Sequence, residues 1–148
     1  MKLTYKGDYA LKIILDLAQH YDKGLSRVKD ISERQDIPKK YLEQIIIILK
    51  GAGYVRSRRG PDGGISLAKP PEKIMLGEII RLTDGATSPI TCISKTEPSK
   101  CRDFGRCSFV DMWRDIRDYT NSIVDNTTFA DMVEKSKKIS VKHPDYNI

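Results

Sequence analysis

The sequence lacks any long hydrophobic segment. Its longest unbroken apolar run covers residues 45–49, which is far too short to cross a bilayer. The N-terminus also lacks the uninterrupted apolar region and the small-residue cleavage site of a signal peptide. These absences predict a soluble, cytoplasmic protein that has no membrane partner.

Residue sets that are typical of catalysis are missing as well. The chain has only two histidines, and it contains no combination of nucleophile, histidine and acid. Its glycine-rich segment, residues 60–64, lies between two predicted strands and not at the start of a helix, where it could bind phosphate. We therefore expect a protein that is not an enzyme.

Cysteine is scarce and confined to one place. Cys92, Cys101 and Cys107 lie in a single polar segment with the spacing C-x8-C-x5-C. A disulfide is unfavourable in a reducing cytoplasm, and three cysteines cannot all pair within one chain. The segment therefore favours metal or redox chemistry. Tetrahedral zinc is an alternative, but zinc modules usually contain a closely spaced cysteine pair that is missing here.

Charge of one sign is in excess. Lysine and arginine number 26 against 20 aspartates and glutamates, which gives a net charge of +6. This excess favours a polyanionic partner such as nucleic acid. A solvated basic surface explains the charge equally well, so the charge alone does not decide between the two.

Apolar spacing in the first 85 residues predicts helices, then a hairpin, then another helix. The helical pattern covers about 4–22, a short stretch near 28–35, and a third stretch that opens at Pro38 and ends near residue 50. Strands at 54–58 and 65–68 flank the turn at 60–64, and a fourth helix follows near 76–84. This order is typical of a winged helix-turn-helix domain. The predicted fold class is therefore mainly α with a small β-hairpin wing.

A polar face is predicted on the third helix, opposite its apolar residues. This face carries Lys40, Glu43, Gln44 and Ile47. Glutamine matches adenine in the major groove, glutamate accepts a hydrogen bond from cytosine, and lysine reaches phosphate or guanine. A solvated helix face explains each residue when it is taken alone. The hairpin that follows changes this balance.

Three arginines, Arg56, Arg58 and Arg59, lie at the end of the hairpin, beside its glycine turn. Arginines on a rigid tip can follow phosphates or enter a narrow minor groove. A reading helix followed at once by such a wing predicts binding to double-stranded DNA. In a dimer it would read a pseudo-palindromic operator.

A long helix is predicted at residues 108–124. Its apolar positions alternate in spacing between three and four, and an average of 3.5 is typical of a coiled-coil seam. Docking of this seam on its own domain is the alternative. We expect instead a homodimer whose interface contains Phe109, Met112, Trp113, Ile116, Tyr119 and Ile123.

The chain is thus expected to have four parts. Residues 1–85 form the DNA-binding domain, 86–107 the cysteine loop, 108–138 the dimerisation helices and 139–148 a flexible tail. A capping-box pattern, with Thr128 followed three residues later by Asp131, marks the start of the last helix.

Several motifs resemble those of one bacterial family. MKLTYKGDYA at residues 1–10, DISERQ at 30–35, YLEQ at 41–44, RGPDGG at 59–64 and LGEII at 76–80 resemble the Rrf-two family of transcription regulators, to which IscR and NsrR belong. The similarity runs in register from Met1 to about Lys135. It implies a dimeric winged-helix repressor or activator.

The resemblance also implies that Tyr41, Glu43 and Gln44 lie on or beside the reading helix and that Arg59 lies near the minor groove. Together with the residues chosen above, the candidate DNA contacts are Lys39, Lys40, Tyr41, Glu43, Gln44, Arg56, Arg58, Arg59 and Gly60.

The resemblance further implies that the cysteine loop holds an iron–sulfur cluster, of the 2Fe–2S or the 4Fe–4S type. Such clusters usually take four protein ligands, and the three cysteines supply three. IscR-like members place a histidine where this chain has Val110, which cannot ligate iron. Asp8 resembles the aspartate that NsrR-like members contribute from the partner subunit, so we predict it as the fourth ligand. The alternatives are an ordinary carboxylate in the first helical turn, or ligation by Asp103 or Asp111.

These observations predict a sequence-specific regulator, with repression the expected mode, that senses iron–sulfur status, redox state or nitric oxide. The alternative is a clusterless, CymR-like regulator of cysteine or sulfur metabolism, controlled by a protein partner or by thiol oxidation. The segments TSPI at 87–90 and DNTT at 125–128 resemble that branch.

Overall fold

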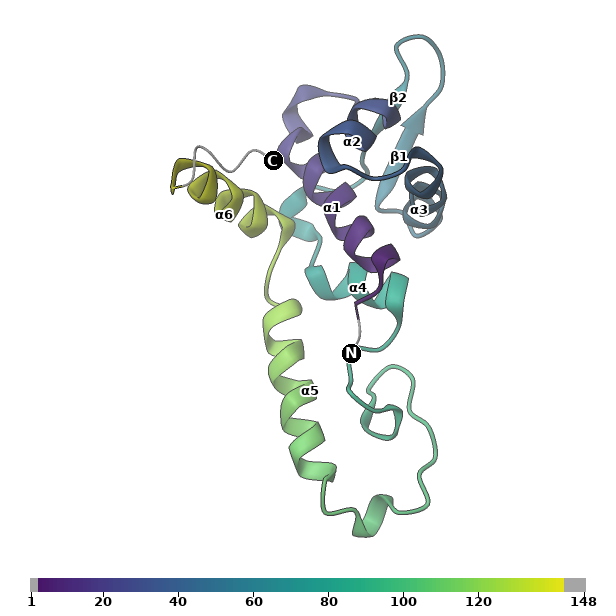
Figure 1. Ribbon diagram of the computed structural model, residues 1–148, viewed down its shortest axis with the longest axis vertical. Coiled ribbons are helices and arrows are strands. Elements are labelled where there is room, and N and C mark those ends of the chain that lie inside the picture. Colours follow the sequence, from purple (N-terminus) through teal and green to yellow (C-terminus); the bar gives the residue numbers. More distant parts are fainter. Residues whose placement is uncertain (1–2, 143–148) are drawn as a thin grey trace.

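The computed structural model describes residues 3–142, with side chains as far as Ile139. Figure 1 shows two parts along the long axis, a helical domain with a β-hairpin at one end and a long helix with an extended loop at the other. The helices are α1 (Tyr5–Gln19), α2 (Val28–Gln35), α3 (Lys39–Gly51), α4 (Leu76–Asp84), α5 (Val110–Val124) and α6 (Phe129–Lys142). The strands are β1 (Val55–Arg58) and β2 (Gly64–Leu67). The predicted fold class, a mainly helical chain with a hairpin wing, is confirmed.

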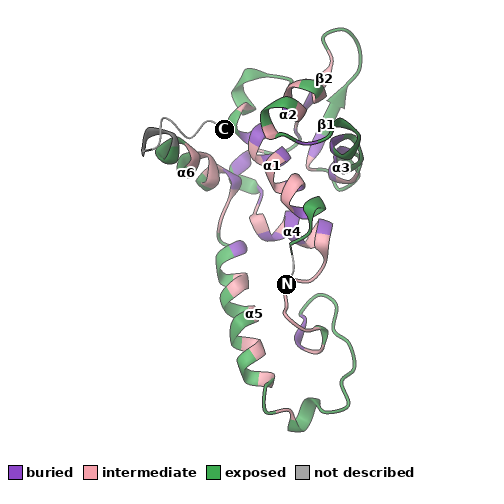
Figure 2. Cartoon of the chain, viewed as in Figure 1, coloured by how far each residue is buried: buried purple, intermediate pink, exposed green. Residues whose placement is uncertain are grey.

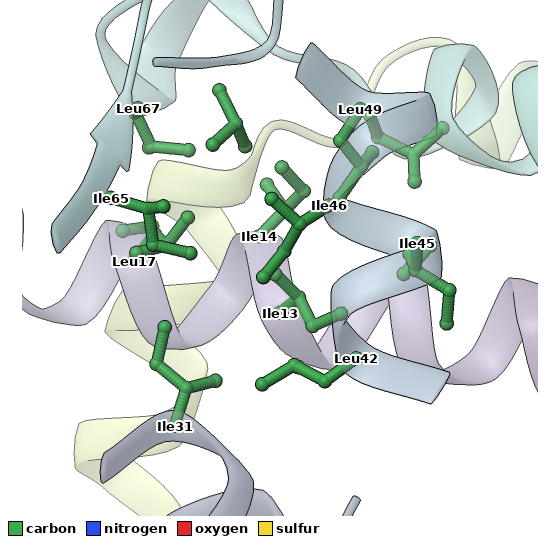
Figure 3. Close-up of a cluster of buried hydrophobic side chains, with 14 of the residues drawn as sticks. Ile13, Ile14, Leu17, Ile31, Leu42, Ile45, Ile46, Leu49, Ile65 and Leu67 are labelled. Carbon is green, nitrogen blue, oxygen red and sulfur yellow. The ribbon is translucent and has the colours of Figure 1, made fainter. Parts of the chain in front are cut away.

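α1 is the central element of the hydrophobic core. Ile13 and Ile14 on this helix have no exposed surface, and their neighbours come from α2, α3 and the hairpin (Figure 3). A fully buried aliphatic side chain of this size contributes about 1.5–3 kcal/mol. The residues that surround them include Leu17, Ile31, Leu42, Ile45, Ile46, Leu49, Ile65 and Leu67.

A charged side chain lies inside this core. Asp16 of α1 is fully buried, and its carboxylate accepts hydrogen bonds from Arg34 Nη2 at 2.7 Å and Arg34 Nε at 2.9 Å. Gln35 Nε2 donates a third bond at 3.0 Å. The hydrogen bond to Asp16 raises the pKa of Arg34 above its ordinary value. Both carboxylate oxygens are thus satisfied, which offsets the cost of burying the charge and ties the end of α2 to α1.

The wing is an antiparallel pair in which Val55 faces Leu67 and Arg58 faces Gly64. Ser26, just before α2, pairs with Ile65 through two backbone hydrogen bonds of 2.9 and 2.8 Å. The hairpin is therefore tied to the segment that leads into α2. At the tip, a β-carbon on Gly63 would lie 2.4 Å from the carbonyl oxygen of Arg58, so the chain needs glycine there.

Both ends of α4 are bound to neighbouring elements. Asp84 at its C-terminus accepts hydrogen bonds from Thr4 N at 2.8 Å and Thr4 Oγ1 at 2.6 Å, at the start of α1. Gly7 allows this approach, because a β-carbon there would lie 2.2 Å from an Asp84 oxygen. The residue before α4 pairs with the start of α6 through an isolated bridge between Met75 and Thr128.

α6 returns the chain to the helical domain, where Phe129 is buried in the core against α1. The predicted capping box at its start is confirmed, because Thr128 N donates to Asp131 Oδ2 at 2.8 Å and Asp131 N donates to Thr128 Oγ1 at 3.1 Å. α5, by contrast, extends away from the core and exposes most of its surface (Figure 2).

Several predicted boundaries differ from the structure, and among them α5 begins at Val110 and not at residue 108. α1 ends at Gln19 and not at residue 22, because a 3-10 turn (Tyr21–Lys23) and Gly24, with φ of +88°, redirect the chain. The last helix continues to Lys142, so the first part of the expected tail, 139–142, is helical. The remainder of that tail, 143–148, lies outside the described residues.

Replacing Asp16 by asparagine should test the buried ion pair. We expect Asp16→Asn to lower the free energy of unfolding by about 2–3 kcal/mol, because the Arg34 guanidinium loses its counter-ion and a neutral amide cannot accept from every donor. Urea unfolding followed by circular dichroism measures this. Asp22→Asn, at an exposed position, is the matched control and should change the value by less than about 0.5 kcal/mol. Equal effects of the two variants would contradict this role for Asp16.

Candidate DNA-binding surface and cysteine loop

The outer face of α3 is polar and solvent-exposed, as its sequence predicts. Leu42, Ile45, Ile46 and Leu49 are buried, which leaves the opposite face of the helix to solvent. Ile47 is also exposed there, with 70% of its surface accessible, which is unusual for an isoleucine. The residues on the open face include Lys39, Lys40, Tyr41, Glu43 and Gln44.

Two contacts organise the beginning of this face. Tyr41 packs edge-on against Tyr9 of α1, with ring centroids 6.4 Å apart. Lys39 Nζ lies 3.9 Å from Glu43 Oε1, a weak exposed pair that a phosphate could replace. Tyr41 is thus positioned by the core helix, whereas the charged side chains are bound only loosely. The face can therefore rearrange on a polyanion at little cost.

The wing carries its arginines with different degrees of restraint. Arg56 Nε donates to Ser66 Oγ at 3.0 Å, so this guanidinium is held against the opposite strand. Arg58 and Arg59 are exposed and make no ion pair among the described residues. Gly60 turns the chain beside them with φ of +113°, a conformation that favours glycine. The tip therefore presents two unneutralised guanidinium groups beside the open face of α3.

The cysteine loop follows α4 and extends to the end of the molecule opposite the wing tip (Figure 1). Ser99 folds back on Thr91, with Ser99 N donating to Thr91 O at 3.2 Å and the two hydroxyl oxygens 2.6 Å apart. This closure brings Cys92 and Cys101 to the edge of one open hollow, although eight residues separate them. The long first gap of the cysteine motif is therefore compatible with convergent thiols.

The three thiols influence one another. All are free; Cys92 and Cys107 are half-buried, and Cys101 is exposed. Burial raises the pKa of the Cys92 thiol, and its neighbours Cys101 and Cys107 raise this pKa further. An open hollow beside Cys92 and Cys101 is also lined by Lys100 and Arg102. These cations would favour a bound anion.

The cysteine loop of one chain is not a complete ligand set for a cluster. Iron–sulfur clusters are usually held by about four ligands. Within residues 3–142 of one chain, no three or more histidines, cysteines, aspartates and glutamates are grouped so that they could hold a metal ion. The thiols converge, but they do not form a complete set. A single chain therefore does not fit a cluster without rearrangement of the loop and a further ligand.

Asp8 does not join the cysteines in the single chain. It lies in the first turn of α1, and its carboxylate pairs with Lys12 Nζ at 2.9 Å. Its side chain is 41% exposed, so it remains accessible to another molecule. An open hollow beside it is lined by Leu3, Thr4 and Tyr5. The predicted DNA-binding residues thus lie at one end of the molecule and the cysteines at the other. Asp8 lies apart from both groups.

The predicted seam of α5 is exposed in the single chain. Tyr119 is 71% accessible and Phe109 63%, and the other seam residues Met112, Ile116 and Ile123 are also exposed, whereas Trp113 is half-buried. The alternative, in which the seam docks on its own domain, is therefore not what the single chain adopts. Large apolar side chains aligned on one face are typical of an interaction surface.

The structure also contains a polar cluster that no sequence motif predicted. Arg117 of α5 donates from Nη1 to the Ile93 carbonyl at 2.6 Å, and Arg81 of α4 pairs with Asp125. These contacts attach α5 to the cysteine loop and to α4. No short motif signalled them, because the partners lie 24 and 44 positions apart in the sequence.

None of the helices within residues 3–142 is both long enough and apolar enough to pass through a membrane.

Comparison with known proteins gives consistent matches. A family model described as "Rrf2: Iron-dependent Transcriptional regulator" matches residues 3–135. The HTH-type transcriptional regulator CymR of Bacillus subtilis is 35% identical over 132 residues, covering 89% of each chain. The HTH-type transcriptional regulator IscR of Yersinia pestis is 37% identical over 141 residues, covering 95% of this chain and 84% of its own length.

Solved structures agree with these sequence matches. The structure of CymR, described as the global cysteine regulator of B. subtilis, superposes with a TM-score of 0.78 at 31% identity, covering 91% of this chain and 98% of that one. T. potens IscR gives a TM-score of 0.77 at 34% identity, covering 94% and 90%. These relatives are transcriptional regulators and not enzymes, in agreement with the prediction from the sequence.

Proposed function

Because this chain belongs to the Rrf2 family of transcriptional regulators, we propose that it is a cytoplasmic homodimer that binds a pseudo-palindromic operator in double-stranded DNA and represses transcription. The observation that carries this proposal is the exposed polar face of α3 beside an arginine-tipped wing. α3 enters the major groove, and the wing reaches the phosphates or the minor groove. Gln44 and Glu43 face base edges, and Ile47 meets a thymine methyl group.

The dimer forms through α5. Its exposed seam residues pack against the same residues of a second copy, which buries the apolar side chains that a single chain leaves in water. In such a two-fold dimer the two wings would be related by the symmetry axis. Two half-sites can then be read together.

The cysteine loop is the sensor in this proposal. In the first form, Cys92, Cys101 and Cys107 hold an iron–sulfur cluster, and Asp8 of the partner subunit completes the ligand set that one chain lacks. The cluster would supply an iron centre that responds to oxidants or nitric oxide. The exposed Asp8 carboxylate, paired only with Lys12 among the described residues, supports this assignment.

A second form of the proposal is clusterless, with control by thiol oxidation or a protein partner, and regulation of cysteine or sulfur metabolism. Two observations favour it. The thiols of Cys92 and Cys101 line one open hollow, and CymR, described as a cysteine regulator, resembles this chain over 91% of this chain's length. In this form, a two-electron oxidant such as a peroxide would remove two electrons and two protons from the two thiols and join Cys92 and Cys101 in a disulfide.

Removing one wing arginine should test the DNA surface. Arg59→Ala should weaken operator binding roughly tenfold and reduce the salt dependence of the affinity by about one counterion, because one phosphate contact is lost. Fluorescence anisotropy with operator DNA selected from a random pool, at several salt concentrations, measures both. Lys137→Ala on α6 removes an exposed cation elsewhere and should change neither. Equal losses in the two variants would refute the wing contact, and failure to select any sequence would refute the regulator.

A charge in the seam should separate the subunits. Ile116→Lys places an ammonium group among apolar residues of both copies, so we expect the dimer dissociation constant to rise by at least about a hundredfold. Sedimentation velocity over a range of concentrations measures it. Asp111→Lys, an exposed site on the same helix outside the seam, should leave the dimer intact. A wild-type monomer at all concentrations would refute the α5 interface.

Metal analysis should separate the two forms of the sensor. If a cluster is held, anaerobically purified protein should contain iron and sulfide and absorb visible light, and Asp8→Ala should lose iron faster than wild type while Asp22→Ala does not. Iron-free protein that cannot be reconstituted would refute the cluster. The thiol form then predicts a Cys92–Cys101 disulfide after mild oxidation, found by peptide mass analysis and missing in Cys101→Ser.

A further inference from the structure

A polar cavity of about 250 Å³ lies between α4, the beginning of the cysteine loop and α5. It is separate from both the DNA surface and the thiols. The lining residues that matter here are Arg81, Thr87, Lys95, Arg117, Asn121 and Asp125. Its volume corresponds to roughly eight water molecules at about 30 Å³ each, so it suits a small metabolite rather than a drug-sized ligand.

The charges around the cavity do not balance. Asp118 accepts from Arg117 Nε at 2.9 Å and Nη2 at 2.8 Å, and it also pairs with Lys95 Nζ at 3.1 Å. Arg81 pairs with Asp125. Three cations therefore share two carboxylates, which leaves one positive charge in excess. Arg117 and Lys95 lower the pKa of Asp118 to about 2, so this carboxylate is already ionised at neutral pH and cannot add further negative charge.

The cations are held where an anion would interact strongly with them. The Arg117 side chain is 13% exposed and the Arg81 side chain 26%, so both guanidinium groups are shielded from bulk water. Electrostatic attraction is stronger in such surroundings than at an open surface. Glu97, another acid of the loop, lies beside Gly85 and forms no ion pair with Arg81, Lys95 or Arg117 among the described residues.

The neutral groups of the cavity also favour an acceptor-rich ligand. The buried Thr87 hydroxyl donates to Asn121 Oδ1 at 2.5 Å. One lone pair of the Asn121 oxygen is thus engaged, and the amide nitrogen carries two donor hydrogens that a ligand can accept. Ser94 Oγ accepts from Glu97 N at 2.9 Å and from Thr96 N at 3.3 Å, and it lies 3.4 Å from Thr96 Oγ1, so this hydroxyl is engaged within the loop.

We propose that this cavity binds a small hydroxycarboxylate monoanion. The carboxylate matches the single positive charge in excess, and its hydroxyl groups match the amide and hydroxyl lining. Because the lining joins α4 of the DNA-binding domain to α5 and to the segment that carries Cys92, the bound anion would hold these three parts together. The effect of the anion on DNA binding rests on the proposed function. The binding of the anion to the cavity does not.

Calorimetry with the full-length wild-type protein and glycerate as the probe tests the binding. We expect one site per chain, no heat from glycerol, which keeps hydroxyl groups but lacks the charge, and weaker binding of inorganic phosphate.

Asn121→Asp cancels the excess charge and should weaken glycerate binding by at least about tenfold. Lys95→Gln removes one cation whose side chain is 64% exposed, and it should weaken binding without unfolding the chain. Gln19→Glu adds the same negative charge at an exposed position on α1 and should bind glycerate as wild type does.

Two results would overturn the proposal. One is the lack of glycerate binding at millimolar concentration, and the other is equal affinity in wild type and in both cavity variants, with folding checked by circular dichroism. Phosphate that binds more tightly than glycerate would refute the carboxylate class. A separate arm measures operator affinity with and without glycerate. Binding of glycerate in a protein that selects no DNA would support the site while refuting the regulator, so the two failures remain distinguishable.

Discussion

The structure depends on one buried charge. Asp16 lies in the last turn of α1, and its carboxylate is satisfied only when Arg34 and Gln35 at the end of α2 reach it. A buried carboxylate without such donors would cost several kcal/mol. The requirement therefore fixes α2 against α1 in one arrangement. α3 follows after a short turn, so its outer face is fixed as well.

From this centre the molecule extends in two directions. The open face of α3 and the arginine tip lie at one end, and the cysteine loop with α5 lies at the other (Figure 1). α4 connects the two, because Thr4 of the α1 entry binds Asp84 at its end and Asp125 at the end of α5 binds Arg81 on it. Gly77 makes the second contact possible, since a β-carbon there would lie 2.1 Å from an Asp125 oxygen. In the proposed regulator, a signal from the loop would reach the DNA-binding domain through α4, through α5 and α6, or through the partner subunit of the proposed dimer.

The two proposed forms of the sensor and the proposed anion site would all act at the same place in the structure. Each would act on the joint between α4, the loop and α5, and not on the reading helix. A change in that joint alters the relation between the two subunits of the proposed dimer. Because half-site spacing is set by dimer geometry, a small shift there is sufficient to change operator affinity.

Much of the fold and the DNA surface could be predicted from local patterns. The 3.6-residue spacing of Leu42, Ile45 and Leu49 defines which side of α3 is buried, and the Gly60–Gly64 cluster permits only a turn, because these are properties of consecutive residues. The Arg117–Ile93 and Arg81–Asp125 contacts, the cavity that they border and the convergence of Cys92 with Cys101 could not be predicted in this way. They join residues far apart in the chain, and only the packing of α5 beside α4 and the closure of Ser99 on Thr91 brings those groups together. The sequence by itself thus determined the elements and their buried faces, whereas the tertiary structure decided which distant polar groups meet.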